Sequence, residues 1–590
     1  MRKWKVLNQT QKSPPKASSK GRWASGPDQP LAEKLKTQNH NLKVKVAEII
    51  SILLNNRGFK SKKAIDEFLN PSLDHISKYR FFDTNSLEKA IQRIKKAIEK
   101  KEQVIVYSDY DADGITGAAI LWETFDTLGA DAYPYVPNRM EEGYGLSKKG
   151  IDNVRKDYPN AKLIITVDHG ITAVEQTAYA KEKGFDIVIT DHHTLPKKLP
   201  KAYAIIHTTE LAGSGVAYVF SKKCSDAIHG VKNKGAINRI TTDLTNDHLA
   251  LAAIGTISDL VPLIGHNRVI AKFGLEVLNN TKRIGLLSLF EESGLLGRPI
   301  GTYEVGFMIG PRINASGRLT HALDALRLLC TKSPKRAELL AKLLNQTNLD
   351  RQSMLQIATQ HAKTLVSSEK KLLFIAHESY HEGVIGLVAS KLVEEYYRPA
   401  IVLSKGEMYS KASARSINGF NIVEAIRTCS DILVNVGGHP MAAGFTVETS
   451  KLIVLEKRLV QFATEQIRDA QLERELRIDT ELSFSDISWE LYDAIKQFEP
   501  FGIGNPEPVF ISNDVAIVDA RVIGRDNNHL KLKVKQHHSP KGVVFDAIGF
   551  GKGELYAQLS PDKPISIAYS LSANEWNGNT SLQLKLKDLQ

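Results

Sequence analysis

The stretch QVIVYSDYDADG, residues 103–114, joins a continuously apolar run to a cluster of aspartates. Two similar runs follow, KLIITV at 162–167 and FDIVIT at 185–190, and segments with a helical pattern separate the three. Strands that are apolar throughout are typical of parallel sheets, because helices cover both faces of such sheets. From 86 to about 265 this alternation predicts an α/β fold built on a parallel sheet.

Each of the three predicted strands runs into acidic or imidazole side chains, which are Asp109, Asp111 and Asp113 after the first, Asp168 and His169 after the second, and Asp191, His192 and His193 after the third. All strands of a parallel sheet point the same way, so these side chains are expected together at its carboxyl edge, where open α/β sheets bind ligands. Another acid, Asp259, lies in the apolar stretch AAIGTISDLVPL, where a lone carboxylate needs a partner. An aspartate after a strand is also a common helix N-cap, but capping does not account for three such strand ends in succession.

Clustered carboxylates raise one another's pKa unless cations neutralise them. Oxygen-rich ligands with one imidazole suit Mg²⁺ or Mn²⁺ better than zinc, which prefers thiolates or several histidines. Two such ions about 4 Å apart, bridged by a shared carboxylate, support phosphodiester hydrolysis. The pattern therefore predicts a site for two divalent cations, Mn²⁺ or Mg²⁺.

The composition is that of a globular protein with several domains. Its 590 residues exceed what one hydrophobic core accommodates, and 42% are hydrophobic and 24% charged. There is no run of about 18 apolar residues and no apolar segment behind the basic start, so we expect a cytoplasmic protein without a membrane span. The three cysteines lie too far apart for a paired-cysteine zinc site or a disulfide framework.

The formal net charge of +12 is concentrated near the N-terminus. Residues 1–45 hold eleven Lys and Arg against Asp28 and Glu33, and the rest of the chain carries only about +3. A segment rich in Ser, Pro and Lys is typical of a flexible arm, so 1–45 is expected to be one. Net charge alone does not indicate a nucleic-acid partner.

The remaining chain divides into four segments by its hydrophobic pattern. Residues 46–85 have apolar residues at helical spacing and are expected to form a helical cap on the domain that follows. The helical period of 333–368, uninterrupted by glycine or by proline after Pro334, predicts one long helix that links two lobes. A second α/β unit is expected at 369–450. Residues 451–590 combine a helix with five short strands, which predict an OB-like β-barrel, with a β-sandwich as the alternative.

Several motifs resemble those of the DHH phosphoesterase family. DYDADG, VDHG, DHH and the downstream SD match its phosphoesterase motifs, and GGHPMAAGF (437–445) is similar to the motif of its DHH-associated domain. PRINASGRL (311–319) and FEPFGIGNPEPVF (498–510) resemble the single-strand-specific 5′→3′ exonucleases of the family in particular. The resemblance runs from about residue 45 to the C-terminus. It implies a DHH domain at 86–332 and a DHH-associated domain at 369–450, followed by a C-terminal nucleic-acid-binding barrel.

The resemblance also implies roles for individual residues. The family's metal ligands match Asp111, Asp113, Asp168, His192 and Asp259, with Asp168 as the bridge. His193 matches the second histidine, which would contact the scissile phosphate or assist protonation. Asp109 and Asp191 would orient the ligands, as metal sites require.

A second set of residues resembles the family's contacts to the terminal phosphate and the neighbouring backbone, and it comprises Arg139, Arg318, Arg415 and His439. Guanidinium groups suit this task because their planar fork donates two hydrogen bonds to phosphate oxygens. Ser413 and Gly438 would add neutral donors. Arg312 is a nearby candidate that could equally brace its loop.

The resemblance thus implies an exonuclease that releases 5′-mononucleotides from single-stranded DNA in recombination and repair. Helicase and single-strand-binding protein partners, and action as a monomer, are expected with this role. One alternative is a phosphodiesterase of short oligonucleotides or cyclic dinucleotides, a type that typically lacks the C-terminal barrel. Another is a catalytically inactive single-strand-binding subunit, which would have lost metal ligands. Neither the polarity of digestion nor the choice between the two cations follows from residue spacing.

Overall fold

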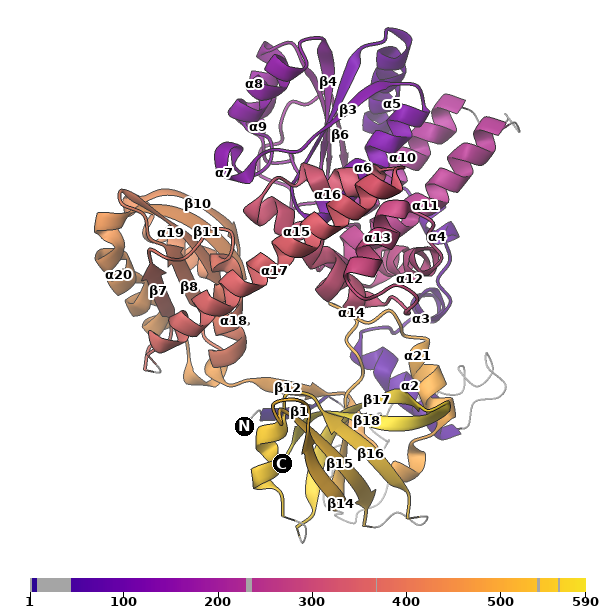
Figure 1. The fold of residues 1–590 in the computed structure, drawn as a ribbon, viewed down its shortest axis with the longest axis vertical. Helices are drawn as coiled ribbons and strands as arrows, with labels where there is room; N and C mark the ends of the chain where they lie inside the picture. The colour runs from indigo at the N-terminus through magenta and orange to yellow at the C-terminus, as the bar shows by residue number, and fades with distance from the viewer. Residues whose placement is uncertain (1–2, 8–43, 230–235, 368, 538–541, 561–562) are drawn as a thin grey trace, which may run out of the picture. The chain divides into compact units, whose positions relative to one another are not determined.

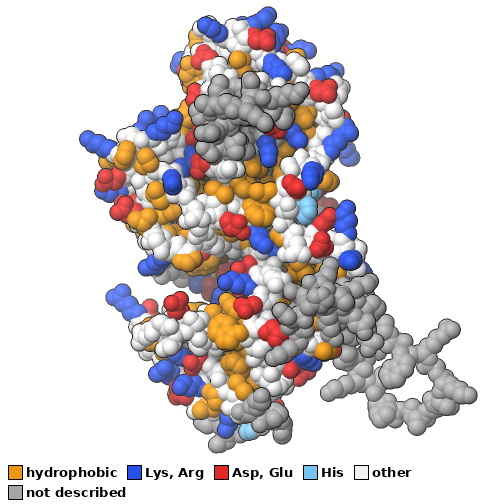
Figure 2. All heavy atoms as spheres, turned by 90° about the vertical axis from the view of Figure 1, so that its right-hand side faces the viewer, with side chains coloured by type: hydrophobic (Ala, Val, Ile, Leu, Met, Phe, Trp, Pro, Cys, Tyr) orange, Lys and Arg blue, Asp and Glu red, His pale blue; other side chains and the backbone are white. Residues whose placement is uncertain are grey.

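The structure is a computed structural model that describes residues 3–7, 44–229, 236–367, 369–537, 542–560 and 563–590. The chain forms two compact units, Leu73–Glu473 and the combination of Met1–Ser72 with Arg474–Gln590 (Figure 1). Among the described residues, no helix is both long and apolar enough to cross a membrane. On the face drawn in Figure 2, basic and acidic side chains are interspersed.

The larger unit contains the predicted parallel sheet. Its five strands follow the order β3-β2-β4-β5-β6, and every neighbouring pair is parallel. The three predicted strands are confirmed as β2 (Gln103–Ser108), β4 (Ala161–Val167) and β5 (Asp186–Asp191). The edge strands β3 (Asp131–Tyr135) and β6 (Ala204–His207) were not predicted.

Helices cover both faces of this sheet. Val104 and Val106 of β2 belong to a core beneath one layer of helices, whereas Ile105 and Tyr107 belong to a second core on the opposite face. The helices of the first layer are α5 (Thr84–Glu99), α6 (Ala112–Thr127) and α10 (Gly213–His229), and those of the second are α8 (Lys148–Asp157) and α9 (Val174–Glu182). Burial on both faces explains why the central strands are nearly continuously apolar.

A helical subdomain extends the first layer. Its elements are α4 (Asp74–Ser77), α11 (Ala236–Ser258), α12 (Gly265–Asn279), α13 (Ile284–Glu292), α14 (Thr302–Glu304), the π-helix η1 (Val305–Ile309), α15 (Gly310–Leu319) and α16 (Leu323–Cys330). The expected long helix is α17 (Pro334–Thr364), whose first turn is capped by the hydroxyl of Ser333. It packs on α13, α15 and α16 and then on α18 of the second lobe. A short helix, α7 (Arg139–Glu142), follows β3.

The second lobe of this unit contains a mixed five-stranded sheet of order β10-β11-β9-β8-β7. Only β7 and β8 are parallel neighbours. Its elements are β7 (Leu373–His377), α18 (Ile385–Tyr396), β8 (Ala400–Ser404), β9 (Tyr409–Arg415), α19 (Ile422–Arg427), η2 (Ser430–Ile432), β10 (Leu433–His439), β11 (Ala442–Glu448), η3 (Thr449–Lys451), α20 (Leu452–Gln466) and η4 (Asp469–Leu472). This lobe is the predicted second α/β unit.

The smaller unit is built on a closed ring of strands. β14 pairs with both β15 and β17, and the ring continues through β16 and β18, as in an OB-like barrel. Its elements are β12 (Glu475–Ile478), β13 (Thr480–Glu481), η5 (Phe484–Asp486), α21 (Trp489–Lys496), β14 (Phe510–Ile523), β15 (His529–Gln536), β16 (Val544–Gly549), η6 (Gly553–Gln558), β17 (Ile565–Trp576) and β18 (Asn579–Leu589).

The N-terminal segments differ from the sequence-based expectation. Helices α2 (Val44–Asn56) and α3 (Lys62–Leu69) share a hydrophobic core with the C-terminal strands, so they do not cap the domain that follows them in sequence. Within the expected flexible arm, β1 (Lys3–Val6) pairs in parallel with β12, while residues 8–43 lie outside the described residues. An amphipathic pattern shows that one helix face is buried, but not against which surface.

Candidate active site

The aspartate cluster begins where β2 ends. The backbone N–H of Asp109 donates to the carbonyl of Val167 (3.1 Å), which ties this loop to the end of β4. Asp111 is the N-cap of α6, and its Oδ1 accepts hydrogen bonds from the backbone N–H groups of Asp113 and Gly114, each 3.0 Å long. A helix N-terminus favours a carboxylate through these free donors and its dipole. The helix thereby fixes an acid of the cluster in place.

Asp113 is buried in the first turn of α6 and is held by a second helix. Its Oδ2 accepts from the backbone N–H of Gly213 (2.6 Å), and its Oδ1 accepts from that of Ser214 (3.0 Å), both in the first turn of α10. These two donors could not be identified from the sequence, because backbone N–H groups have no side-chain signature. The small residues of LAGSG (211–215) were the available signal.

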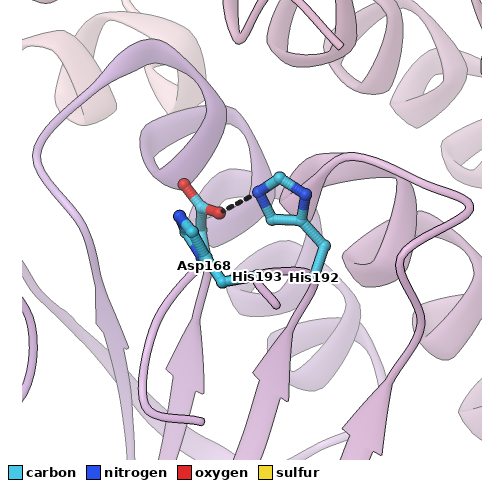
Figure 3. A group of neighbouring side chains, drawn as sticks. All are labelled: Asp168, His192 and His193. Atoms are coloured by element: carbon cyan, nitrogen blue, oxygen red, sulfur yellow. Dashed lines mark ion pairs between the residues drawn. The ribbon is translucent and has the colours of Figure 1, made fainter. Parts of the chain in front are cut away.

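Asp168 follows β4 in a left-handed backbone conformation, with φ of 66°. Its carboxylate and the ring of His192 point toward one another above the strand ends (Figure 3). Asp168 Oδ1 lies 3.1 Å from His192 Nε2, yet both atoms are buried and make no hydrogen bond within the described part of the chain. Two such orphaned buried atoms are costly without a further partner.

The carboxylates and imidazoles converge as the sequence predicted. His192 Nε2 also lies 3.6 Å from Asp259 Oδ2 and 4.0 Å from Asp113 Oδ2. Three sets of possible ligand atoms each lie within 4.8 Å of one another, namely Asp168, His192 and His193; Asp113, His192 and Asp259; and Asp109, Asp111 and Asp168. All five predicted ligands are in these sets, and Asp109 and His193, to which the sequence analysis gave other roles, join them.

Asp191 holds the second histidine. Its Oδ1 lies 2.7 Å from His193 Nδ1 and accepts from the backbone N–H of His192 (2.7 Å), while its Oδ2 accepts from that of Ile171 (2.8 Å). Burial raises the pKa of Asp191, but the hydrogen bond from His193 and the charge of that ring outweigh burial and hold this pKa below its ordinary value. Burial lowers the pKa of His193, yet the same hydrogen bond leaves that pKa raised.

The other acids of the cluster are strongly perturbed. Burial and then the neighbouring carboxylates raise the pKa values of Asp109, Asp111 and Asp168, and bring that of Asp259 to about 9. Burial lowers the pKa of His192, so this ring favours its neutral, metal-ligating form. A buried set of carboxylate oxygens with neutral imidazole fits Mn²⁺ or Mg²⁺, whose charge would offset the mutual repulsion.

A cleft of about 530 Å³ adjoins this cluster through Tyr110, which stands between Asp109 and Asp111. Five of the seven residues predicted to contact DNA line it, namely Arg139, Arg318, Ser413, Arg415 and Gly438. They come from both lobes of the larger unit, on α7, α15, β9 and β10. The cleft is also lined by Tyr144 and Lys411, which the sequence analysis missed.

The three cleft arginines form no ion pair with any carboxylate among the described residues. Arg139 lies over the ring of Tyr110 at 5.2 Å, Arg318 Nη1 donates to the carbonyl of Gly383 (3.3 Å), and Arg415 Nη1 donates to that of Ala414 (2.8 Å). Burial, followed by the nearby guanidinium groups, lowers the pKa of Arg318 to about 10. Partly buried arginines without carboxylate partners form a site for an anion such as phosphate.

Two residues predicted to contact DNA do not line the cleft. Arg312 Nε donates to Asn345 Oδ1 (3.0 Å) and its Nη1 donates to the carbonyl of Met308 (2.7 Å), so it joins α15 to α17. His439 is exposed at the end of β10. Asn314, on α15, accepts from the backbone N–H of Ala112 (2.7 Å) and so braces the aspartate loop.

Comparison with known proteins identifies the family. Residues 103–256 match the model described as the DHH family, N-terminal domain, 369–468 match the DHHA1 domain, and 478–588 match the RecJ OB domain. The chain is 37% identical to the single-stranded-DNA-specific exonuclease RecJ of Bacillus subtilis (strain 168), over 97% of this chain and 71% of that protein. It belongs to the RecJ family. The RecJ of Haemophilus influenzae is 31% identical over 91% of this chain and 95% of its own length.

Solved RecJ structures are similar to the whole chain. The crystal structure of RecJ from Thermus thermophilus in complex with Mn²⁺ matches with a TM-score of 0.80 and 28% identity, over 100% of this chain and 79% of that one. The same protein in complex with Mg²⁺ matches with a TM-score of 0.75 and 27% identity, over 100% and 78%. Both cations named for these RecJ structures are those that the donor set of the acidic cluster fits.

Proposed function

We propose that this chain degrades single-stranded DNA from its 5′ end, releasing 5′-mononucleotides by two-metal-ion hydrolysis in recombination and repair. The observation that carries the proposal is that the acidic cluster and the arginine cleft, each lacking counter-charges, lie next to one another. Buried carboxylates that need cations stand directly beside arginines that need anions. A divalent-metal phosphodiesterase supplies both, because its substrate is a phosphate chain. The names of the RecJ relatives support single-stranded DNA as that chain.

In this proposal Asp111, Asp113, Asp168, His192 and Asp259 hold the two cations. When bound, such cations activate a water and stabilise charge on the phosphate and on the leaving oxygen. Asp168 is the one carboxylate that occurs in two of these three ligand sets, which supports its role as the bridge. Asp109 lies in one set with Asp111 and Asp168, so its carboxylate either orients those ligands or joins them.

His193 is proposed to act on the scissile phosphate. Its Nδ1 is engaged by Asp191, so its Nε2 is the ring nitrogen left for the substrate. Because that hydrogen bond raises the pKa of the ring, His193 at neutral pH carries more of the protonated form than a free imidazole does. A proton held there can be donated to a phosphate oxygen or to the leaving oxygen.

The cleft would recognise the strand end. Arg139, Arg318 and Arg415 present guanidinium groups to phosphate oxygens, and the Ser413 hydroxyl and the Gly438 backbone add neutral donors. We propose that the 5′ phosphate is the group held here. The OB domain would bind the strand further along, because OB folds hold single strands by charge and stacking.

The cellular setting forms part of the same proposal. A repair exonuclease acts on strands that a helicase opens and a single-strand-binding protein covers, so we propose both as partners. We further propose that the chain acts as a monomer in the cytoplasm. Size-exclusion chromatography with light scattering tests the monomer, and pull-down with purified partner proteins tests the associations.

The test uses a DNA single strand labelled at one end, with either Mn²⁺ or Mg²⁺, and a duplex of the same sequence. A 5′ label should appear at once as a mononucleotide, a 3′ label should give a ladder of shortening products, and the duplex should resist. Internal cleavage, or earlier release of a 3′ label, contradicts the proposal. Faster hydrolysis of a dinucleotide than of a long strand favours the oligonucleotide phosphodiesterase, and binding without hydrolysis favours the inactive subunit.

A further inference from the structure

The arginine cleft contains one negative charge. Among the described residues that line it, Glu382 is the only one with a carboxylate. Its Oε2 lies 2.7 Å from Nζ of Lys411, and the two side chains are 31% and 49% exposed. Ion pairs with this exposure contribute little to stability. A carboxylate also lowers the affinity of such a cleft for anions in general, so its presence indicates selection among them.

The ion pair lies at one end of a row of cleft residues on β9. Lys411, Ser413 and Arg415 alternate with buried residues, so their side chains share the strand face that lines the cleft, in steps of about 6.6 Å. Gly386, in the first turn of α18, closes against this row, because a Cβ there would lie 2.8 Å from Ser413 Oγ. The loop before α18 therefore runs beside the row and places Glu382 at its Lys411 end.

The opposite end of the row, at Arg415, is the end nearer the metal ligands. Burial, and then the charge of Arg139, lower the pKa of Arg415. Burial and a neighbouring carboxylate raise the pKa of Asp109, and the charge of Arg139 offsets part of that rise. Arg139 is thus within electrostatic range of both the acidic cluster and Arg415. Lys411 lies two steps further along β9, on the side of the row away from the metal ligands.

This direction matters for the group at the end of the strand. In the proposed function the scissile linkage lies at the metal ligands, and the terminal phosphate lies at Ser413 and Arg415. Phosphates attached to the terminal one would extend away from the scissile linkage, toward Lys411. A 5′-triphosphate, the end of a strand begun from a nucleoside triphosphate, carries two such phosphates. The cation that they would approach is already neutralised by Glu382.

We propose that Glu382 restricts the cleft to strand ends with a single 5′ phosphate, because its carboxylate neutralises Lys411 and repels the outer phosphates of a 5′-di- or triphosphate. This inference rests on the proposed function and specifies the end group that the cleft accepts. Like charges brought together near a protein surface lower affinity by about tenfold or more. A strand begun from a nucleoside triphosphate would become a substrate only after hydrolysis of its phosphoanhydride bonds.

The first test measures strand binding by the full chain in EDTA, so that hydrolysis does not intervene. Three single strands of one sequence carry a 5′ monophosphate, a 5′ triphosphate or a 5′ hydroxyl. Wild type should bind the monophosphorylated strand about tenfold more tightly than the triphosphorylated one. Glu382→Gln should bring this ratio close to one, chiefly by tighter binding of the triphosphorylated strand. Glu382→Asp, which keeps the charge, should retain more of the ratio than Glu382→Gln does.

A second variant separates charge from the integrity of the ion pair. Lys411→Ala breaks the same ion pair but leaves the carboxylate without its cation, so the ratio should rise and not fall. The matched control is Glu456→Gln, whose carboxylate pairs with Lys370 at 2.8 Å in the same lobe. Those side chains are 32% and 45% exposed and do not line the cleft. This variant should keep the wild-type ratio, and thermal denaturation checks that all variants fold.

The same selectivity should appear in hydrolysis. With Mn²⁺, kcat/KM should be higher for the monophosphorylated strand than for the triphosphorylated one in wild type, and Glu382→Gln should narrow this difference. Raising the salt concentration should narrow it in wild type as well, because exposed charges are screened.

Equal binding of the mono- and triphosphorylated strands by wild type would overturn the inference, and so would an unchanged ratio in Glu382→Gln. A shift in the same direction in Glu382→Gln and Lys411→Ala would also overturn it, since only the ion pair as a structural link would then matter. If wild type neither binds nor degrades any of the three strands, the proposed function itself fails. If wild type degrades all three equally well, only the selectivity is wrong.

Discussion

The acidic cluster and the arginine cleft are adjacent sites of opposite charge, and they are held in different ways. Asp111, Asp113 and Asp191 each accept hydrogen bonds from backbone N–H groups at helix starts or turns, so their positions are fixed by the fold. The cleft arginines make few bonds, and two lobes contribute them. This difference indicates that the metal site is largely formed in the absence of cations. The side chains of the strand-binding cleft, by contrast, become ordered when phosphate binds.

A third charged cluster, around Glu123, has the features of ion pairs that only stabilise the fold. Glu123 is hydrogen-bonded to both Arg283 (2.8 Å) and His248 (2.9 Å), and Arg283 also reaches Asp247. Every charge in this cluster has an opposite partner within the chain. Among the described residues, the acidic cluster contains no Lys or Arg partner for its carboxylates, and the three cleft arginines have no carboxylate partner. This difference is the reason to assign both sites to ligands rather than to stability.

The largest expected effect comes from Asp168→Ala. Loss of the carboxylate shared by two ligand sets should lower hydrolysis by about a thousandfold or more, because metal stabilisation of the transition state contributes several kcal/mol. Single-strand binding in EDTA should survive, since the cleft is untouched. Initial rates on a labelled strand measure hydrolysis, and a gel-shift assay in EDTA measures single-strand binding. Nuclease activity near the wild-type level would refute the site.

A smaller effect, on metal affinity, is expected when a side chain is introduced next to the same acidic cluster. A Cβ at position 213 would lie 2.5 Å from Asp168 Oδ1, so Gly213→Ala should displace that carboxylate and weaken Mn²⁺ binding by about 10- to 100-fold. Isothermal titration with Mn²⁺ measures this, with circular dichroism to check folding. Gly306→Ala meets open space and should leave Mn²⁺ affinity unchanged. Equal affinity in both variants would show that the cluster is less rigid than the backbone bonds suggest.

The strand site should respond to Arg415→Ala. Binding of a 5′-phosphorylated strand should weaken by about tenfold, the scale of a charged hydrogen bond, and its advantage over an unphosphorylated strand should shrink. The matched control is Arg458→Ala, whose guanidinium is exposed and paired with Asp431 at 2.9 Å in the same lobe. An unchanged ratio between the two strand ends in Arg415→Ala would remove this residue from the phosphate site.

The structural cluster should affect stability and not the rate of hydrolysis. Burial raises the pKa of Glu123, but the hydrogen bonds from Arg283 and His248 outweigh it and bring the pKa to about 2. Because the folded-state pKa is depressed, the stabilisation is present above the ordinary glutamate pKa and is lost as pH falls from about 5 toward 2. Glu123→Gln should lower the free energy of unfolding by about 2–3 kcal/mol at pH 7 and by much less near pH 3.

Urea denaturation at the two pH values measures that difference. The hydrolysis rate of folded Glu123→Gln at pH 7 should equal that of wild type. An equal loss of stability at both pH values would show that the variant acts through packing and not through charge.

Much of the fold could be predicted because its signals are local. Val104 and Tyr107 face opposite cores, so a continuous apolar run marks a central strand. The edge strand β3 contains Pro134 and two tyrosines and gives no such run, as expected at a sheet edge. Leu53 marks a buried helix face, but the core to which it belongs also contains Phe510, more than 400 residues away, and no local pattern encodes that association.

The candidate site was predictable to a similar degree. Parallel topology brings strand ends together, so the convergence of the acids followed from their order in the sequence. The backbone donors at Gly213 and Ser214 could not be found this way, because they depend on where α10 starts relative to α6. Arg312 belongs to the same motif as Arg318, yet only Arg318 lines the cleft, since α15 directs the two side chains differently.

The left-handed backbone of Asp168 bears on how easily this protein could change its role. Asparagine adopts positive φ as readily as aspartate does, and its side chain has an uncharged NH2 group in place of one carboxylate oxygen. Asp168→Asn would therefore need no backbone adjustment, and the arginines and the OB domain would remain as they are. A single base change in the gene, from an aspartate to an asparagine codon, would therefore abolish hydrolysis and leave strand binding in place. A protein that binds and protects DNA ends is thus one substitution away from an enzyme that degrades them.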